Sequence, residues 1–407
     1  MKLQKLLIFT IFIFTTAIMQ AQTANSLYDS GMAKFKQNDI NGAIAEFTKC
    51  IEKNSIFYEA YIGRGDCYAF LKKYDEAVAD YSKALEIYPN YYLAYIRRAN
   101  TYAQVSNNKK ALADYSKAIE LKNDKEDAYL GRAGFYQKNN DQKLALADLN
   151  KVIEINKQNF EAYFQRAMIL KSDKKNKEAL NDFSAAIAIK PDYSEAYYQR
   201  GLLYESMLNY APASVDFKKA IDLNIRNKEI YTHKSMASFN SNKWDEAIDD
   251  YTVLINTYSV KDAMVFYNRG LCYYRTGKLN EALKDFTKSA QVNPKNDSAY
   301  TWIAKIYAEQ KNLKNAQLFY NKAISINPSN DAAYAGRAKI LSEQGKFEQA
   351  IQDWNNALKS VAVPEWFYER ALCKESVNDK KGMCEDLKSA SDLGYKKASD
   401  IYNRNCK

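Results

Sequence analysis

The chain has 407 residues, and 47% of them are hydrophobic, which is enough apolar material for an extensive buried core. It has only 13 glycines and 6 prolines, so a turn-rich β fold and flexible linkers are both disfavoured. The formal charge is +10, but basic and acidic residues alternate along the chain without a long block of one sign. A solvated surface of mixed charge explains this pattern better than a nucleic-acid-binding patch does.

Residues 1–21 have the organisation of a secretory signal peptide. Lys2 and Lys5 precede the apolar run LLIFTIFIFTTAIM, and small and polar residues follow it. The predicted cleavage site follows Ala21, with Ala17 as the second choice. A lipoprotein is not indicated, because no cysteine lies near this site. An uncleaved membrane anchor is the alternative, but this run is shorter than the roughly 20 residues that span a bilayer. We expect an exported protein, periplasmic or secreted, with no transmembrane segment after cleavage; association with the outer envelope is left open.

From residue 24 to residue 397, one pattern of 34 residues recurs eleven times. Aspartates lie 34 residues apart from Asp80 to Asp250, and each repeat is numbered so that this aspartate is at position 23. Position 20 is alanine in ten repeats, position 8 is always small, and position 24 is aromatic or leucine. Positions 4, 8 and 11 share one helical face, as do positions 20, 24 and 27. Each repeat therefore predicts two antiparallel amphipathic helices.

This pattern resembles the tetratricopeptide repeat, which has the same period and the same residue types at positions 4, 8, 20, 24, 27 and 32. The resemblance implies an all-α fold, a right-handed superhelical solenoid of about eleven helix–turn–helix repeats whose first helices line the concave face. The departures are Lys34 and Ser238 at position 11, and one extra residue between repeats 7 and 8. Residues 395–404 are expected to form a polar capping helix, so residues 398–407 contain its end.

The aspartate at position 23 faces the buried side of its helix, where a charge needs a partner. Position 7 is arginine in eight repeats and Lys234 in repeat 7. Repeat 9 has Ile303 at position 7 and Phe319 at position 23, so both charges are missing together, which indicates pairing within each repeat. Repeat 1, with Ser30 and Glu46, departs from this scheme. The predicted pairs are Arg64–Asp80, Arg98–Asp114, Arg132–Asp148, Arg166–Asp182, Arg200–Asp216, Arg269–Asp285 and Arg337–Asp353.

Residues suited to catalysis are scarce. The single histidine, His233, has no cysteine or histidine at ligand spacing, and no phosphate-binding loop occurs, so we expect no enzyme, metal or cofactor.

Some tetratricopeptide repeat proteins bind a C-terminal carboxylate with lysine and asparagine at positions 5 and 9, and that pair is missing here. Cysteines at position 10 (Cys67, Cys272 and Cys373) are expected to be buried thiols, whereas Cys384 and Cys406 are candidates for a disulfide in an exported protein.

Positions 2, 5, 6 and 9 of each first helix lie opposite its buried stripe and are expected to face the groove. In repeats 3, 4 and 10, positions 6 and 9 are mostly small or polar, but in repeats 5 to 9 the face is apolar and aromatic with polar neighbours. Such a surface is typical of a partner site. The alternative is that positions 5 and 9 pack against the next repeat, while position 6 is expected to be freer. The candidate partner-binding residues are Phe164, Met168, Tyr198, Gln199, Leu202, His233, Met236, Tyr267, Asn268, Leu271 and Trp302.

The sequence therefore predicts a non-enzymatic scaffold of bacterial type that binds a protein or peptide segment in its concave groove. No nucleic-acid partner is expected. Two alternatives stay open, namely a structural subunit of a cell-envelope or secretion assembly, and a solenoid that binds an envelope oligosaccharide. Neither the identity of the partner nor the oligomeric state follows from the sequence.

Overall fold

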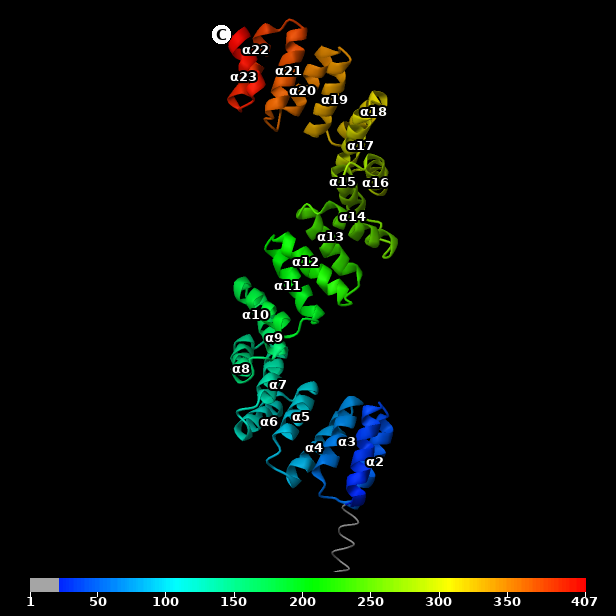
Figure 1. The fold of residues 1–407 in the computed structure, drawn as a ribbon, viewed down its shortest axis with the longest axis vertical. Helices are drawn as coiled ribbons and strands as arrows, with labels where there is room; N and C mark the ends of the chain where they lie inside the picture. Colours follow the sequence, from blue (N-terminus) through cyan, green and yellow to red (C-terminus); the bar gives the residue numbers. More distant parts are fainter. Residues whose placement is uncertain (1–21) are drawn as a thin grey trace, which may run out of the picture. The chain divides into compact units, whose positions relative to one another are not determined.

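The computed structural model describes residues 22–407, and the predicted signal peptide with its Ala17 and Ala21 lies outside the described residues. These described residues form α-helices joined by short turns, without a strand (Figure 1). Among them, no helix combines the length and the apolar character that a membrane crossing requires. The chain divides after Ala196 into two compact parts, here termed the N-terminal body (residues 22–196) and the C-terminal body (residues 197–407).

The N-terminal body consists of helical hairpins that follow the 34-residue period. Residues 22–36 form the first helix of repeat 1. In repeats 2 to 5, the first helix begins at position 1 and the second at position 17, so the predicted two-helix repeat is confirmed. The helices are α2 (Ile40–Lys53), α3 (Tyr58–Phe70), α4 (Tyr74–Ile87), α5 (Tyr92–Gln104), α6 (Asn108–Leu121), α7 (Glu126–Lys138), α8 (Gln142–Ile155), α9 (Phe160–Ser172) and α10 (Asn176–Ile189).

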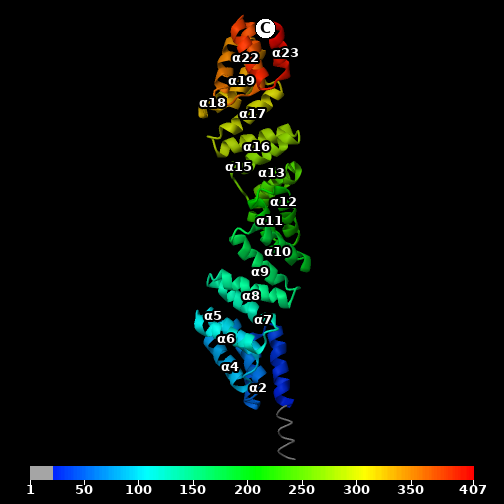
Figure 2. The same ribbon diagram turned by 90° about the vertical axis from the view of Figure 1, so that its left-hand side faces the viewer.

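The C-terminal body continues the same hairpins, which Figure 2 shows from a second side. The division between the two bodies lies inside α11 (Ser194–Ser206). The remaining helices are α12 (Tyr210–Asp222), α13 (Lys228–Asn240), α14 (Trp244–Asn256), α15 (Ala263–Arg275), α16 (Leu279–Val292), α17 (Asp297–Glu309), α18 (Leu313–Ile326), α19 (Asp331–Glu343), α20 (Phe347–Ala357), α21 (Pro364–Ser376), α22 (Lys380–Asp392) and α23 (Lys396–Asn405).

The core of each repeat is the contact between the small residue at position 8 and the large residue at position 24. A Cβ atom added at Gly65 would lie 2.8 Å from the ring of Tyr81, and one at Gly201 would lie 2.8 Å from Phe217. Both rings are almost completely buried. Because the ring fills the space that a side chain at position 8 would need, only small residues let the two helices approach.

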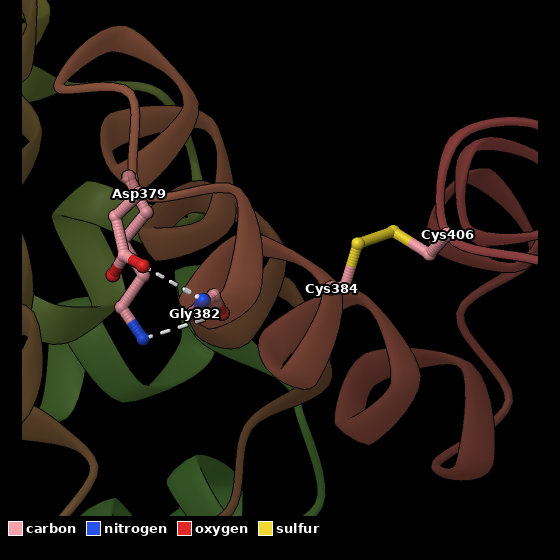
Figure 3. Close-up of a disulfide and its surroundings, with 5 residues drawn as sticks. Asp379, Gly382, Cys384 and Cys406 are labelled. Atoms are coloured by element: carbon pink, nitrogen blue, oxygen red, sulfur yellow. Dashed lines mark hydrogen bonds between the residues drawn. A yellow bond between two sulfur atoms is a disulfide. The ribbon is translucent and has the colours of Figure 1, made fainter.

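The last helix, α23, closes the C-terminal end of the C-terminal body. It covers α22 and buries Ala398 completely. Figure 3 shows the disulfide between Cys384 on α22 and Cys406 just beyond α23, whose Cα atoms are 5.6 Å apart. In the same view, the side chain of Asp379 accepts a hydrogen bond of 2.9 Å from the backbone N–H of Gly382 and so caps α22. The capping helix begins one residue later than the sequence indicates.

Candidate functional site

The charged side chains at positions 7 and 23 meet within their own repeat. Arg64 Nε and Nη2 each lie 2.8 Å from a carboxylate oxygen of Asp80, and its guanidinium lies over the ring of Tyr61 at position 4. The same two-point contact occurs in each of the other arginine repeats. The pairs are Arg98–Asp114, Arg132–Asp148, Arg166–Asp182, Arg200–Asp216, Arg269–Asp285, Arg337–Asp353 and Arg370–Asp386.

Repeat 9 fills the place of this ion pair with an aromatic ring. Phe319, at position 23, stacks on Tyr300 at position 4 and on Tyr307 at position 11, with centroid distances of 6.3 and 5.7 Å. In other repeats, arginine lies over the tyrosines at these positions. Ile303 at position 7 is only 1% exposed. The loss of both charges therefore leaves no charged group without a partner and no gap between the two rings.

Repeat 1 departs from the arginine–aspartate scheme but still pairs its buried acid. Lys34 Nζ lies 2.9 Å from Glu46 Oε1. Lys34 stands at position 11, one helical turn after Ser30, which has replaced the arginine of position 7. The two departures of this repeat thus compensate for each other, which the sequence comparison at position 7 alone missed.

The arginines also connect neighbouring repeats, a role that the sequence analysis did not predict. Arg64 Nη1 donates to Thr48 Oγ1 at 3.1 Å, and Arg337 Nη1 donates to Asn321 Oδ1 at 2.6 Å. Both acceptors occupy position 25 of the preceding repeat. Position 25 is serine, threonine or asparagine before every repeat with an arginine at position 7, whereas Lys218 precedes the repeat that has Lys234. The combination of a polar residue at position 25 with an arginine at position 7 of the next repeat is visible in the sequence and could have predicted this contact.

The lysine repeat holds its aspartate less firmly than the arginine repeats do. Lys234 Nζ makes one contact of 2.6 Å with Asp250 Oδ2, and both side chains are buried. Burial raises the pKa of Asp250 to about 6, although the Lys234 ammonium opposes the shift. Glu246 and Asp249 nearby raise this pKa further. Asp250 is therefore a buried carboxyl that titrates near neutral pH.

The expectation that position 6 is freer of packing than positions 5 and 9 is wrong for Trp302 and His233. Trp302 stacks on Phe286 of repeat 8 with a centroid distance of 5.8 Å, and its Nε1 donates to Tyr267 Oη at 3.0 Å. His233 likewise stacks on Phe217 of repeat 6, and its Nδ1 lies 2.7 Å from Glu205 Oε2.

The physical reason is that position 6 rests on the large residue at position 24 of the preceding repeat. Gly63, Gly131 and Gly336 also occupy position 6, and a Cβ atom added at each would come within 3 Å of such a ring. A residue that points away from its own partner helix therefore still meets the neighbouring repeat. Trp302 and His233 are packing residues between repeats.

The other predicted residues are divided between packing and exposure. Position 5 packs against the ring at position 24 of its own repeat, as in the pairs Phe164–Phe183, Tyr198–Phe217 and Tyr267–Phe286. At position 9, Met168 is 36% exposed and Met236 is 42% exposed. The partly buried members are Gln199, Leu202, Asn268 and Leu271. Phe164 and Met168 belong to the N-terminal body and the other nine residues to the C-terminal body.

A hollow of about 710 Å³ lies on the first helices of repeats 9 to 11, within the C-terminal body. Two of the predicted residues, Tyr267 and Trp302, contribute to its lining. Its lining includes three small residues of α19, Ala332, Ala335 and Gly336, and the other repeats carry larger side chains at the positions of Ala332 and Ala335. The further lining residues used below are Lys305, Glu309, Lys311, Tyr320, Lys339, Glu343, Trp354, Glu365, Trp366 and Glu369.

Most of the repeats match models of a known protein family. Models described as tetratricopeptide repeat match residues 58–91, 92–125, 126–159, 194–224, 263–296, 297–330 and 319–352. A model described as TPR repeat matches residues 168–207, and together these matches cover more than half of the chain. The chain belongs to the tetratricopeptide repeat family. This family consists in general of non-enzymatic scaffolds for protein–protein interaction.

Solved tetratricopeptide repeat structures are similar to this chain. YrrB, described as a protein with an unusual peptide-binding site, is 25% identical over 46% of this chain and 95% of its own, with a TM-score of 0.39. A protein from Parabacteroides merdae is 20% identical over 61% and 98%, with a TM-score of 0.38. PilW, described as a widely conserved type IV pilus biogenesis factor, is 15% identical over 50% and 94%, with a TM-score of 0.43. No curated protein matches the chain.

The tetratricopeptide repeats of this chain place few reactive groups together. Within residues 22–407, no group of three histidine, cysteine, aspartate or glutamate side chains is arranged to hold a metal ion. The four free cysteines, Cys50, Cys67, Cys272 and Cys373, are buried, and burial raises the pKa of the thiols of Cys67 and Cys272 to about 12. Such thiols stay protonated at neutral pH and are poor nucleophiles. The described surface does contain a hollow that is lined by aromatic and charged side chains.

Proposed function

We propose that this protein is an exported, non-enzymatic scaffold that binds a protein or peptide segment in the hollow formed by α17, α19 and α21. The observation that carries this proposal is the hollow itself, which has a volume of about 710 Å³ and is lined by residues from all three helices. Pockets of several hundred Å³ suit a few side chains of a bound segment.

The residues around the hollow support a protein ligand. Trp366 supplies a large ring from α21, and aromatic residues carry much of the binding energy at protein interfaces. Trp302, which packs between repeats, forms part of the wall of the hollow. Ala332 and Ala335 of α19 also line the hollow, and their small side chains leave room for a side chain of the partner. Charged groups, among them Lys339 and Glu369, also line the hollow and supply polar contacts around its apolar part.

An oligosaccharide is less well suited to this surface. Sugar binding commonly relies on an open aromatic face, but the ring of Trp302 is already stacked on Phe286. The Lys305 ammonium also lies over the Trp302 ring, 4.7 Å from its centroid. Trp354, a further tryptophan of the lining, is only 2% exposed. Little ring surface is left for stacking on a sugar.

The proposal is tested by filling the hollow without disturbing the core. Ala332 is exposed, lines the hollow and stands at position 2 of α19, so Ala332→Trp adds bulk without displacing a buried group. Met264→Trp is the matched control, because Met264 stands at position 2 of α15, is 55% exposed and lies outside the hollow lining. Each variant is used to capture partners from the native envelope, with quantitative mass spectrometry.

A partner that is retained by the wild type and by Met264→Trp but lost from Ala332→Trp supports the proposal. Partners that are retained equally by both variants contradict it and favour a structural subunit held through its edges. A glycan array with the same three proteins separates the remaining alternative, since glycan binding that is lost only from Ala332→Trp would identify an oligosaccharide site.

A further inference from the structure

Two glutamates of α21 lie on one wall of the hollow and one helical turn apart. Glu365 and Glu369 stand at positions 2 and 6 of repeat 11, and both contribute to the lining. Like charges four residues apart on a helix repel each other. Within residues 22–407, no ion pair involves either carboxylate. This wall therefore carries two negative charges that the chain does not neutralise by direct contact.

The other glutamates of the hollow are arranged differently. Glu309 on α17 follows Lys305 by four residues, and Glu343 on α19 follows Lys339 by four residues. Each of these acids thus has a lysine one turn away on its own helix, also in the lining. On α21, the residue four positions before Glu369 is Glu365, and the residue four positions before Glu365, ahead of the helix, is Val361. Neither glutamate of α21 therefore has a lysine at the spacing that is present on α17 and α19.

The cations close to these glutamates in the sequence are engaged elsewhere. Arg370 Nη2 lies 2.6 Å from Asp386 Oδ1, and Lys374 Nζ lies 3.0 Å from Asp386 Oδ2. Both side chains are therefore held on the far side of the repeat, at the buried ion pair of positions 7 and 23. Neither is available to Glu365 or Glu369 without breaking that pair.

The sign of the charge in the hollow is opposite to that of the chain. Its lining contains four glutamates and three lysines, Lys305, Lys311 and Lys339, whereas the whole chain has a formal charge of +10. A negative recess on a positive molecule attracts cationic groups and disfavours anionic ones. The excess negative charge is concentrated on α21.

From this arrangement we propose that the bound segment presents an arginine or lysine side chain to Glu365 and Glu369. An apolar side chain next to it occupies the part of the hollow beside Ala332 and Ala335. Arginine fits this wall better than lysine, because its planar guanidinium can donate to two carboxylates at once. The inference rests on the proposed function, since it names the chemistry of the partner that this hollow binds.

The test uses the full chain with its disulfide intact and a displayed library of random peptides as the probe. Peptides are selected on the wild type, and those blocked by Ala332→Trp are kept as ligands of the hollow. We expect them to share a basic residue next to an apolar one. The Glu365→Gln/Glu369→Gln variant should bind such a peptide about tenfold more weakly. The matched control, Glu309→Gln/Glu343→Gln, removes two charges that have lysine neighbours and should weaken binding much less.

Replacing the basic residue of the selected peptide by glutamine completes a double-mutant cycle. That peptide should lose about tenfold on the wild type and nothing further on Glu365→Gln/Glu369→Gln. Hollow-binding peptides without a shared basic residue, or equal losses in both double variants, overturn the charge inference and leave the proposed function intact. The absence of any peptide that Ala332→Trp blocks overturns both.

Discussion

Phe319 and Tyr307 lie with their ring planes 11° apart and their centroids 5.7 Å apart, in the part of repeat 9 where other repeats hold an arginine–aspartate pair. An aromatic stack can therefore replace a buried ion pair in this fold when both charges are removed together. The same tyrosine framework exists in repeat 4, where Arg132 lies over Tyr129 and Tyr136. Repeat 4 is thus a suitable place to exchange one arrangement for the other.

Removing one member of the pair in repeat 4 should be costly. Asp148→Ala leaves the largely buried Arg132 without its two-point partner, and we expect a loss of roughly 3–5 kcal/mol in unfolding free energy. The double variant Arg132→Ile/Asp148→Phe reproduces repeat 9 and should cost much less. Denaturant unfolding of both variants checks this. Equal destabilisation of the single and double variants would refute the account of the pair.

Trp302 should be a determinant of stability because it packs between repeats 8 and 9. Trp302→Ala removes its stack on Phe286 and its hydrogen bond to Tyr267, and we expect a loss of about 2–4 kcal/mol. Trp302→Phe keeps a ring at this place and should cost less. Thermal unfolding provides the measurement. An unchanged melting temperature in Trp302→Ala would mean that the ring does not contribute to the interface between these repeats.

Asp250 should make the C-terminal body less stable as the pH rises toward neutrality. Its pKa in the folded protein is about 6, above the ordinary value of 3.8, so the folded state binds this proton more tightly than the unfolded state does. The stabilisation is complete below the unfolded pKa and is lost as the pH rises through about 6.

Unfolding is measured between pH 5 and 7.5, and the wild type is compared with Asp250→Asn. The variant cannot titrate at this position, so the loss of stability that deprotonation of Asp250 causes up to about pH 6 should be absent from it. Identical pH profiles for the two proteins would show that Asp250 does not titrate in this range.

The disulfide between Cys384 and Cys406 should fasten the capping helix. The two residues are separated by 22 positions, and a cross-link of this length contributes about 3 kcal/mol in the chain-entropy model. Alkylation of the unfolded, non-reduced protein should label only the four cysteines that are free in the structure. Labelling of Cys384 and Cys406 under these conditions would contradict the bond. Their joint replacement by serine should destabilise the C-terminal body.

Much of the fold could be predicted from the sequence because the same residue types recur at the packing positions of eleven repeats. Small residues at position 8 and large ones at position 24 indicate how the two helices of a repeat meet, as Gly65 and Tyr81 do. The joint replacement of two charges by Ile303 and Phe319 indicates that the ion pairs lie within repeats. In these cases, the relevant contacts join residues of one repeat, so the pattern inside a single period contains the information.

Contacts between repeats are harder to infer from such a pattern. A helical projection shows that Trp302 points away from the partner helix of its own repeat, but it does not show Phe286 of the preceding repeat. The link from Arg64 to Thr48 was overlooked for the same reason. The hollow depends on residues of three neighbouring helices, among them Trp302, Gly336 and Trp366. In the sequence alone, its small residues on α19 do not indicate a binding site, because the neighbouring helices that complete the hollow are not apparent.

The proposed function requires that a partner segment occupies the hollow of repeats 9 to 11. A photo-crosslinking residue placed at position 332, at position 264 or at position 318 of the full chain tests it most directly in the native envelope. Leu318, on α18, is 60% exposed and lies outside the hollow lining. We predict that one partner crosslinks from position 332 and not from positions 264 or 318. Crosslinks from position 318 or 264 without any from position 332 would contradict the claim.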